Sequence, residues 1–284
     1  MASYADAKRG VSVSKIPEIL FKYRSWASVL RKDENGSVTE RNYTKESLET
    51  GTFHFSSPRD FDDLHDSLLG PHATGSPLDI DRFILHHKDL FSLMRERKLG
   101  SLTQLNTLTD EAAKKAFAPL TGQETRRHSR VLCFAEEMNN ELMWAGYADY
   151  HRGICLGFDT SVPLFSGIQR VQYLNAPVAD AESPNSPADQ IDPWSLRKSE
   201  AWEFQKEWRL VLPGDEPKRV EFPKHALKVI VLGYRFQERD FDDLKSVLIQ
   251  GGYQVQVFRI ERVPGTFTLA TFFVGEISKP LQQK

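Results

Sequence analysis

Three polar side chains alternate along "QKEWRLVL", residues 205–212, a segment otherwise typical of a β-strand. The two-residue period places Gln205, Glu207 and Arg209 on one face and Trp208 on the other. A solvent-facing Glu–Arg pair would contribute little to stability. The neighbouring tryptophans instead indicate a partly buried strand, where a charged pair is costly unless other groups satisfy or use it. This polar row is therefore a candidate functional site.

A second set of candidates lies on "ILFKYRSW", residues 19–26, which also has the composition of a strand. Alternation places Lys22 and Arg24 on one face and Tyr23 on the other. An arginine beside aromatic residues can hold a phosphate or a carboxylate through its forked donors. The alternative interpretation is a surface cation on an edge strand.

A cluster of acidic residues follows the strand-like segment "TFHFSSP", residues 52–58. The side chains of Asp60, Asp62, His65 and Asp66 include hard oxygen ligands that suit Mg²⁺ or Ca²⁺. Their spacing matches no calcium-binding loop, and aspartate also favours turns through local hydrogen bonds. We therefore assign no metal site, and the roles of Asp62 and Asp66 stay open.

The segment "MWAGYADYHRG" leads from an expected helix into an expected strand. Its aromatic residues, Trp144 and Tyr147, are more typical of a core than of a ligand platform. His151 is the candidate acid or base of this segment, because its side chain titrates near neutral pH.

Composition bounds the class of protein. The chain has 284 residues, 40% of them hydrophobic, which predicts a single globular domain with insertions. Its formal charge of -2 gives no reason to expect strong nonspecific binding to nucleic acid or to an acidic membrane. No apolar run is long enough to span a bilayer, and two cysteines are too few for a disulfide framework. We therefore expect a cytoplasmic protein without a membrane partner.

The pattern of elements predicts an α+β fold with mixed or antiparallel sheets. Helices are expected to begin near Thr44 and end at Gly51, to begin at Asn139 or Asn140, and to cover residues 195–204 and 239–252. Residues 78–120 have the periodicity of a helical insertion. Residues 175–193 carry four prolines and few bulky apolar side chains, which predicts a disordered-like surface loop. No glycine-rich nucleotide-binding motif is present.

Several motifs resemble a family of bacterial proteins known as a domain of unknown function. The motifs are "LFKYRSW", "GTFHFSSPRDFDD", "LMWAGYADYHRGICLGFD", "QYL" and K-x3-W-x4-"EWRLVL", and together they extend from about Leu20 to Gly233. The sequence departs from the family pattern at two positions. Asp62 stands where the family usually has Asn, and Gln205 stands where it usually has the first Glu of E-x-E.

The order of these motifs resembles, more distantly, the mono-ADP-ribosyltransferase superfamily. The resemblance implies an ADP-ribosyltransferase-like fold and NAD as the substrate. Glu207 and Gln205 would be catalytic, and Tyr23, Arg24, Ser56 and Ser57 would bind NAD. Arg24 would hold the pyrophosphate, Ser56 would orient the nicotinamide side, and Tyr23 would stack on a ring.

The chemistry of the reaction suits these residues. Cleavage of the nicotinamide–ribose bond passes through an oxocarbenium-like state, which an anion such as Glu207 can stabilise. Gln205 would position an acceptor group. The leading hypothesis is an NAD-consuming ADP-ribosyltransferase or NAD glycohydrolase, acting on a protein or nucleic-acid acceptor as a bacterial toxin or anti-phage effector. Two alternatives are a metal-dependent nuclease or phosphoesterase using Asp60, Asp62, His65 and Asp66, and a non-enzymatic sensor or interaction module.

Overall fold

The computed structural model describes residues 15–32, 36–61, 63, 66, 129–175, 193–213 and 219–278. The strands are β1 (Ile19–Arg24), β2 (Val29–Lys32), β3 (Val38–Arg41), β4 (Thr52–His54), β5 (Ser129–Ala135), β6 (Ile154–Asp159), β7 (Gln169–Arg170), β8 (Gln172–Leu174), β9 (Arg197–Ser199), β10 (Glu207–Pro213), β11 (Arg219–Glu221), β12 (Leu227–Leu232), β13 (Val255–Arg262) and β14 (Leu269–Ile277). The α-helices are α1 (Tyr43–Thr50), α6 (Glu141–Tyr147) and α7 (Glu238–Gly251). The 3-10 helices are η1 (Pro58–Asp60), η2 (Pro163–Phe165), η3 (Pro193–Leu196), η4 (Glu200–Gln205) and η5 (Lys224–Ala226).

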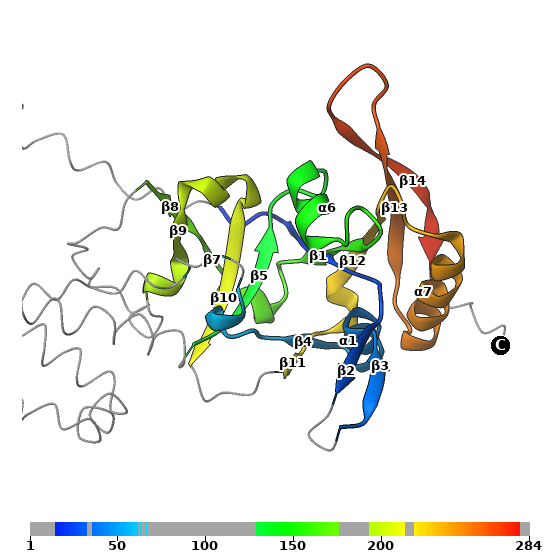
Figure 1. Ribbon diagram of the computed structural model, residues 1–284, viewed down its shortest axis with the longest axis horizontal. Coiled ribbons are helices and arrows are strands. Elements are labelled where there is room, and N and C mark those ends of the chain that lie inside the picture. The colour runs from blue at the N-terminus through cyan, green and yellow to red at the C-terminus, as the bar shows by residue number, and fades with distance from the viewer. Residues whose placement is uncertain are drawn as a thin grey trace, which may run out of the picture.

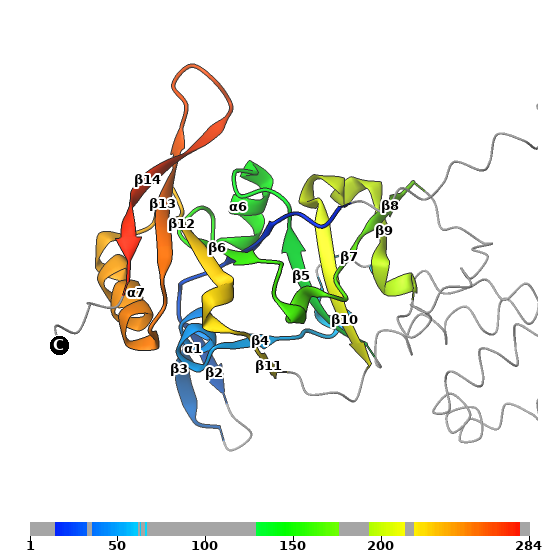
Figure 2. The same cartoon turned by 180° about the vertical axis from the view of Figure 1, so that it is seen from behind.

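These elements form an α+β fold around an eight-stranded sheet with the order β14-β13-β12-β6-β1-β5-β10-β7 (Figure 1). Strands β12 and β13 are parallel, and the other neighbouring strands of the sheet are antiparallel. Helix α7 connects β12 to β13 and lies beside this end of the sheet, as the reverse view in Figure 2 also shows. The expected α+β class with mixed sheets is confirmed.

The large sheet buries apolar side chains on both faces. Strand alternation sends Leu20 of β1 to one face, where it packs in a cluster with Leu48 of α1 and Leu244 of α7. Tyr23 of the same strand lies on the other face, in a cluster with Trp144 of α6. The two faces are therefore covered by different helices.

The large sheet is split between β1 and β5. These strands pair at one position, Phe21 opposite Ala135. Beyond it β1 stays paired with β6 as far as Arg24, whereas Val131 of β5 pairs with Ser56. Neighbouring strands that take different partners must diverge. The split therefore begins beside Lys22 and runs toward the carboxyl end of β1.

The expected helix over residues 195–204 is wrong. The chain instead forms η3, β9 and η4, and η4 ends at Gln205. Lys206 then has a φ of 42°, in the left-handed region, and β10 begins at Glu207. The reason is Lys198, whose buried side chain reaches Gln205 and Glu207 from an extended backbone paired with β8. Gln205 thus lies before the strand that carries Glu207, not on it.

The other helix ends follow their capping residues closely. Asn42, two residues before the expected Thr44, caps α1 by accepting from two backbone N–H groups. Gly51 and Gly252 end α1 and α7 in the left-handed conformation, as predicted. Asn140 caps α6, which confirms one of the two expected caps.

Some expected features lie outside the described residues. The helical insertion at 78–120 is one of them, and of the loop at 175–193 the structure describes Asn175 and Pro193. Strands β2, β3 and β14 were not predicted from the sequence. None of the described helices has the length and apolar character of a bilayer-spanning segment.

The turn after α6 sets the position of the end of β1. A Cβ atom on Gly153 would lie 2.1 Å from the carbonyl oxygen of Arg24, whereas one on Gly146 of α6 would have no neighbour within 4 Å. Gly153→Ala should therefore lower the free energy of unfolding by about 1–3 kcal/mol, the scale of overpacking. Gly146→Ala should leave it unchanged or raise it by up to about 1 kcal/mol. Denaturant unfolding of both variants tests this, and equal stabilities would contradict the close approach.

Candidate functional site

Two adjacent cavities lie beside the split in the sheet. The larger has a volume of about 420 Å³ and the smaller of about 210 Å³. Lys22, Arg24 and His54 line both cavities. The two cavities therefore adjoin at these three side chains.

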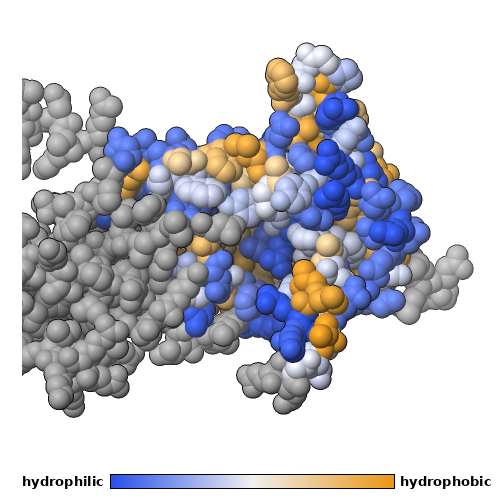
Figure 3. All heavy atoms as spheres, in the orientation of Figure 1, coloured by the Kyte–Doolittle hydropathy of each residue, from blue (hydrophilic) through white to orange (hydrophobic). Residues whose placement is uncertain are grey.

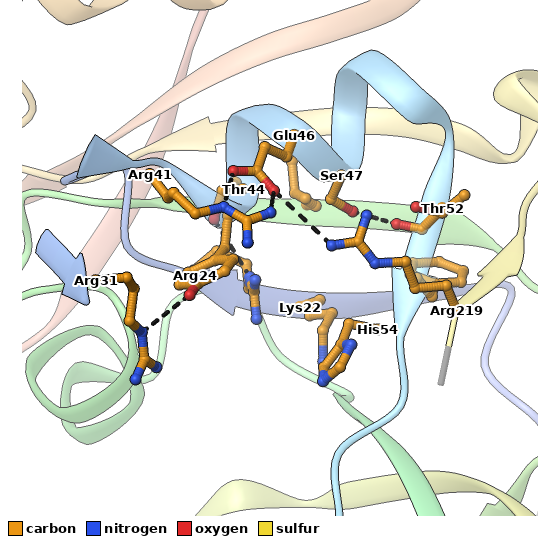
Figure 4. A pocket seen from close by; sticks show the side chains of 13 residues that line it. Lys22, Arg24, Arg31, Arg41, Thr44, Glu46, Ser47, Thr52, His54 and Arg219 are labelled. Atoms are coloured by element: carbon orange, nitrogen blue, oxygen red, sulfur yellow. Dashed lines mark hydrogen bonds and ion pairs between the residues drawn. The ribbon is translucent and has the colours of Figure 1, made fainter. Parts of the chain in front are cut away.

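The larger cavity is rich in positive charge. Its basic lining residues, shown in Figure 4 together with His54, are Lys22, Arg24, Arg31, Arg41 and Arg219. In the part of the chain that the structure describes, Glu46 is the one carboxylate that lines it. Arg41 donates from Nε to Oε1 of Glu46 at 2.7 Å and from Nη2 to Oε2, and Arg219 lies 3.8 Å from the same carboxylate. The Glu46 carboxylate thus pairs with both Arg41 and Arg219. Positive charge exceeds negative charge among the described lining residues, so the cavity suits an anion.

Tyr43 orients two of these arginines. The guanidinium carbons of Arg31 and Arg41 lie 5.7 Å and 5.1 Å from the centre of its ring. Nε of Arg31 also donates to the Tyr43 hydroxyl at 2.9 Å. The β2–β3 hairpin and the start of α1 are therefore joined at the edge of the larger cavity.

The smaller cavity contains most of the sequence-predicted site. Tyr23, Arg24, Ser56, Gln205 and Glu207 line it. Ser57 is not among its lining residues. Tyr23 and Glu207 come from one face of the sheet and Arg24 from the other, because the cavity lies at the split where both faces meet.

Lys22 occupies the split itself. Its Nζ donates to the carbonyl oxygen of Cys133 at 2.9 Å, and lies 5.5 Å from the centre of the Phe134 ring. On β5, Cys133 lies between Ala135, which pairs with β1, and Val131, which pairs with Ser56. The ammonium group therefore satisfies a carbonyl that the divergence of the strands leaves without a backbone partner.

Lys22 and Arg24 carry charge without a carboxylate partner. Within the described residues neither side chain has an ion pair within 4 Å, and Nε of Arg24 donates to the Thr44 hydroxyl at 3.3 Å. Burial, together with the charge of Arg24, lowers the pKa of Lys22 to about 8. Burial also lowers the pKa of Arg24. A bound anion would offset the free-energy cost of burying the charges of Lys22 and Arg24.

On the other side of the smaller cavity lies a cluster of four buried charges: Asp66, Lys198, Glu207 and Arg209. Arg209 donates to both oxygens of Asp66, at 2.8 and 2.6 Å, and to both oxygens of Glu207, at 2.7 and 3.1 Å. Lys198 lies 3.1 Å from Glu207 and 3.3 Å from Asp66. Two cations and two carboxylates balance, which makes their burial tolerable.

The cluster holds Glu207 ionised. Burial opposes the charge of Glu207, but Arg209 and Lys198 outweigh it and hold the pKa of its carboxyl well below the ordinary value. Burial likewise opposes the charge of Lys198, and Glu207 and Asp66 reverse the effect and raise its pKa. The side chain of Glu207 is 6% exposed, and this small part of it faces the cavity.

Gln205 lies between this cluster and α6. Its Oε1 accepts from Lys198 at 2.7 Å, and its Nε2 donates to the Tyr147 hydroxyl at 2.6 Å. The backbone N–H of Glu207 donates to the hydroxyl of Tyr173 at 2.8 Å. Gln205 and Glu207 are thus held side by side through Lys198, although they do not share a strand.

The remaining candidates lie around the cavities in different ways. Tyr23 is buried, donates to the carbonyl of Glu137 at 2.7 Å and meets the ring of Trp144 edge to face at 5.2 Å. Trp144 is fully buried in the core, as expected. His151 has a φ of 68° in the turn after α6 and lines neither cavity, and burial lowers its pKa.

Of the four residues of the metal hypothesis, the structure describes Asp60 and Asp66, and the two have different surroundings. Asp66 binds Arg209, and Asp60 lines the smaller cavity. Asp62 and His65 lie outside the described residues. In the part of the chain that the structure describes, no group of three or more His, Cys, Asp or Glu residues is placed to hold a metal ion.

Sequence reasoning missed several residues of the site. Lys198 was assigned to a helix without a role, although it is the Lys of the K-x3-W-x4-"EWR" motif, a signal that could have marked it. Arg31, Arg41 and Arg219 gave no comparable signal. They are exposed or half-buried residues of short strands that meet only in the folded protein.

One comparison with known proteins found a match, which covers part of the chain. A family model described as "Protein of unknown function (DUF2971)" matches residues 143–210, which is less than half of the chain. The match includes Lys198, Gln205, Glu207 and Arg209, and does not reach Lys22 or Arg24. It supports the resemblance to a domain-of-unknown-function family. Searches of curated proteins and of solved structures found no match.

Asp66→Asn should destabilise the protein strongly, because it leaves an excess positive charge in the buried cluster. We expect the free energy of unfolding to fall by about 3–5 kcal/mol. The matched control is Asp243→Asn, which breaks the ion pair with Lys45 on partly exposed side chains and should cost less than about 1 kcal/mol. Denaturant titrations would show the contrast, and similar losses would mean that the cluster contributes no more than a surface pair.

Anion binding beside Lys22 should depend on pH. The group is protonated below its pKa of about 8, so affinity for an anion should be highest there and fall as pH rises through about 8. Sulfate is a suitable probe because its charge does not change in this range. Lys22→Arg stays charged and should bind sulfate without the decline, whereas Lys22→Met should bind weakly throughout. Calorimetric titrations from pH 7 to pH 10 measure this; a flat profile in the unmodified protein would exclude Lys22 from the binding site.

Proposed function

We propose that this protein cleaves the nicotinamide–ribose bond of an NAD-type dinucleotide, and either transfers the ADP-ribosyl group or hydrolyses it. One observation carries the proposal: Arg24 and Glu207, from strands separated by β5, line the same cavity. A cation for phosphate and an ionised carboxylate for a developing positive charge are what this reaction requires.

The phosphate end of the substrate is assigned to the junction of the two cavities. Lys22 and Arg24 face this junction without carboxylate partners among the described residues, and His54 lines it as well. A pyrophosphate carries about two negative charges and can accept forked donation from a guanidinium. Its binding would compensate the cost of keeping two cations half-buried.

The ribose end is assigned to Glu207. As the glycosidic bond breaks, nicotinamide leaves with the electron pair of that bond, and positive charge develops at the ribose carbon and ring oxygen. An ionised carboxylate in a cavity with little water stabilises this charge and accepts a hydrogen bond from a ribose hydroxyl. Cys133 also lines this cavity, and a thiol is only a weak donor, so it would compete little with a ribose hydroxyl for Glu207.

The second half of the reaction involves Gln205 and the acceptor. A water molecule or an acceptor side chain adds to the ribose carbon and loses its proton, which completes hydrolysis or transfer. Gln205 lies beside Glu207, and its amide is positioned by Lys198 and Tyr147. It would orient the attacking group, while Ser56 on the opposite wall would orient nicotinamide.

Consumption of NAD also gives the cellular role that we propose, a bacterial toxin or anti-phage effector. Depletion of NAD stops metabolism in the cell in which the enzyme is active. Toxicity on expression that requires Glu207 would follow from this proposal.

Glu207→Gln should lower nicotinamide release from NAD by about a hundredfold or more, since it removes a charge that acts in the transition state. The same substitution disturbs the buried cluster, so a matched control is needed. Asp66→Asn removes one charge from the same cluster at a carboxylate that lines neither cavity.

The two variants separate catalysis from stability. Turnover per folded molecule should fall steeply in Glu207→Gln and by less than about tenfold in Asp66→Asn, with folded fractions taken from circular dichroism. Equal turnover in Glu207→Gln and the unmodified protein would refute the catalytic assignment. Loss of phosphodiesterase activity on chelation, without any nicotinamide release, would instead favour the metal-dependent alternative.

A further inference from the structure

The larger cavity carries more positive charge than a pyrophosphate requires. Among the described residues, five basic side chains line it and Glu46 is the single lining carboxylate. Lys22 and Arg24 together match the charge of the pyrophosphate assigned to the junction. The remaining positive charge comes from Arg31, Arg41 and Arg219.

These three arginines differ in how many of their N–H donors already have a partner within the protein. Arg41 donates two hydrogen bonds to Glu46 and is satisfied. Arg31 uses Nε for Tyr43, and within the described residues its two Nη groups have no hydrogen-bond partner. The ion pair of Arg219 is a long contact of 3.8 Å with Glu46. Arg31 and Arg219 therefore keep donors for a ligand.

The geometry of Figure 4 shows how these donors are arranged. Arg31 and Arg219 lie at opposite ends of the group, with Lys22 and Arg24 between them. Tyr43 and Thr44, the first residues of α1, line the same cavity, so the positive end of the helix dipole adds to the field. The donors of β1, β2, β11 and α1 are thus spread over a longer distance than a single pyrophosphate needs.

We propose that the larger cavity binds a second phosphate, the ribose monophosphate of a phosphorylated dinucleotide such as NADP, at the end formed by Arg31, whose Nε is held by Tyr43 and whose Nη groups face no partner among the described residues. This inference rests on the proposed function and names the substrate class. A phosphate monoester carries about -1.5 to -2 charge and three acceptor oxygens, which complements the surplus of the cavity. Arginine recognises such a group through forked donation.

A nucleic-acid acceptor would also present phosphates, but the structure favours a small ligand. The basic groups line one partly open cavity of about 420 Å³ and are not spread along a surface. The formal net charge of the chain is -2, whereas a protein that follows a phosphate backbone commonly carries an extended basic patch.

The test compares two reaction products that lack the scissile bond, ADP-ribose and ADP-ribose 2′-phosphate, by calorimetry at fixed salt. The phosphorylated compound should bind at least about tenfold more tightly, the scale of one charge-assisted hydrogen bond. Arg31→Ala should reduce this preference toward unity and change the affinity for ADP-ribose little, whereas Arg219→Ala, at the opposite end of the group, should keep the preference. Lys228→Ala, a partly exposed lysine of β12 that lines neither cavity, should leave the preference unchanged.

The outcomes distinguish this inference from the function on which it rests. Equal affinity for the two compounds would overturn the second phosphate site and leave the proposed cleavage of NAD intact. Failure of both compounds to bind at millimolar concentration would overturn both proposals. Binding of a single-stranded oligonucleotide that depends on Arg31 and Arg219, with no preference for the 2′-phosphate, would assign these arginines to a nucleic-acid acceptor and also refute the inference.

Discussion

The buried guanidinium of Arg209 is the interaction on which the rest of the site depends. It is removed from water, so its donors must find acceptors within the protein. Asp66, Glu207 and the carbonyl oxygen of Ser195 supply them. These partners come from the segment after η1, from β10 itself and from η3, so one charge determines where three parts of the chain meet. Lys198 then balances the second carboxylate.

The same cluster prepares one wall of the cavity for chemistry. Two neighbouring cations keep Glu207 ionised although it is almost fully buried. On the opposite side, Lys22 and Arg24 lie half-buried without a carboxylate partner in the described part of the chain. The charges on the Glu207 side of the cavity are therefore paired with opposite charges, whereas the cations on the Lys22 and Arg24 side have no carboxylate partner among the described residues. An unsatisfied cation lowers the stability of the free protein, and binding sites commonly carry this cost in return for affinity.

The split in the sheet brings these two walls together. In a continuous sheet, Arg24 and Glu207 would lie on opposite faces and would not share a cavity. Divergence of β1 from β5 after one residue pair opens a space that both faces reach. The ammonium of Lys22 and the backbone of Ser56 complete the hydrogen bonding of β5 along this opening. The backbone arrangement and the function we propose therefore have a common origin.

The sequence by itself determined the α+β class, the positions of β1, β4 and β10, and the ends of α1 and α7 at glycine. These features follow from local physics: a two-residue period, side-chain capping and the freedom of glycine at positive φ. It also selected Arg24, Ser56, Gln205 and Glu207 through the resemblance of short motifs, and the structure brings all four to one cavity.

The tertiary structure alone decided which charges pair and which stay available for a ligand. Asp66 and Arg209 are 143 residues apart, and no local pattern relates them. The expected helix over residues 195–204 was wrong because the ion pairs of Lys198 with two buried carboxylates outweigh local helix propensity. Arg31, Arg41 and Arg219 likewise form one cavity only after three short strands have been placed around α1. Periodicity reports the face on which a side chain lies, whereas the partner it meets there depends on long-range packing.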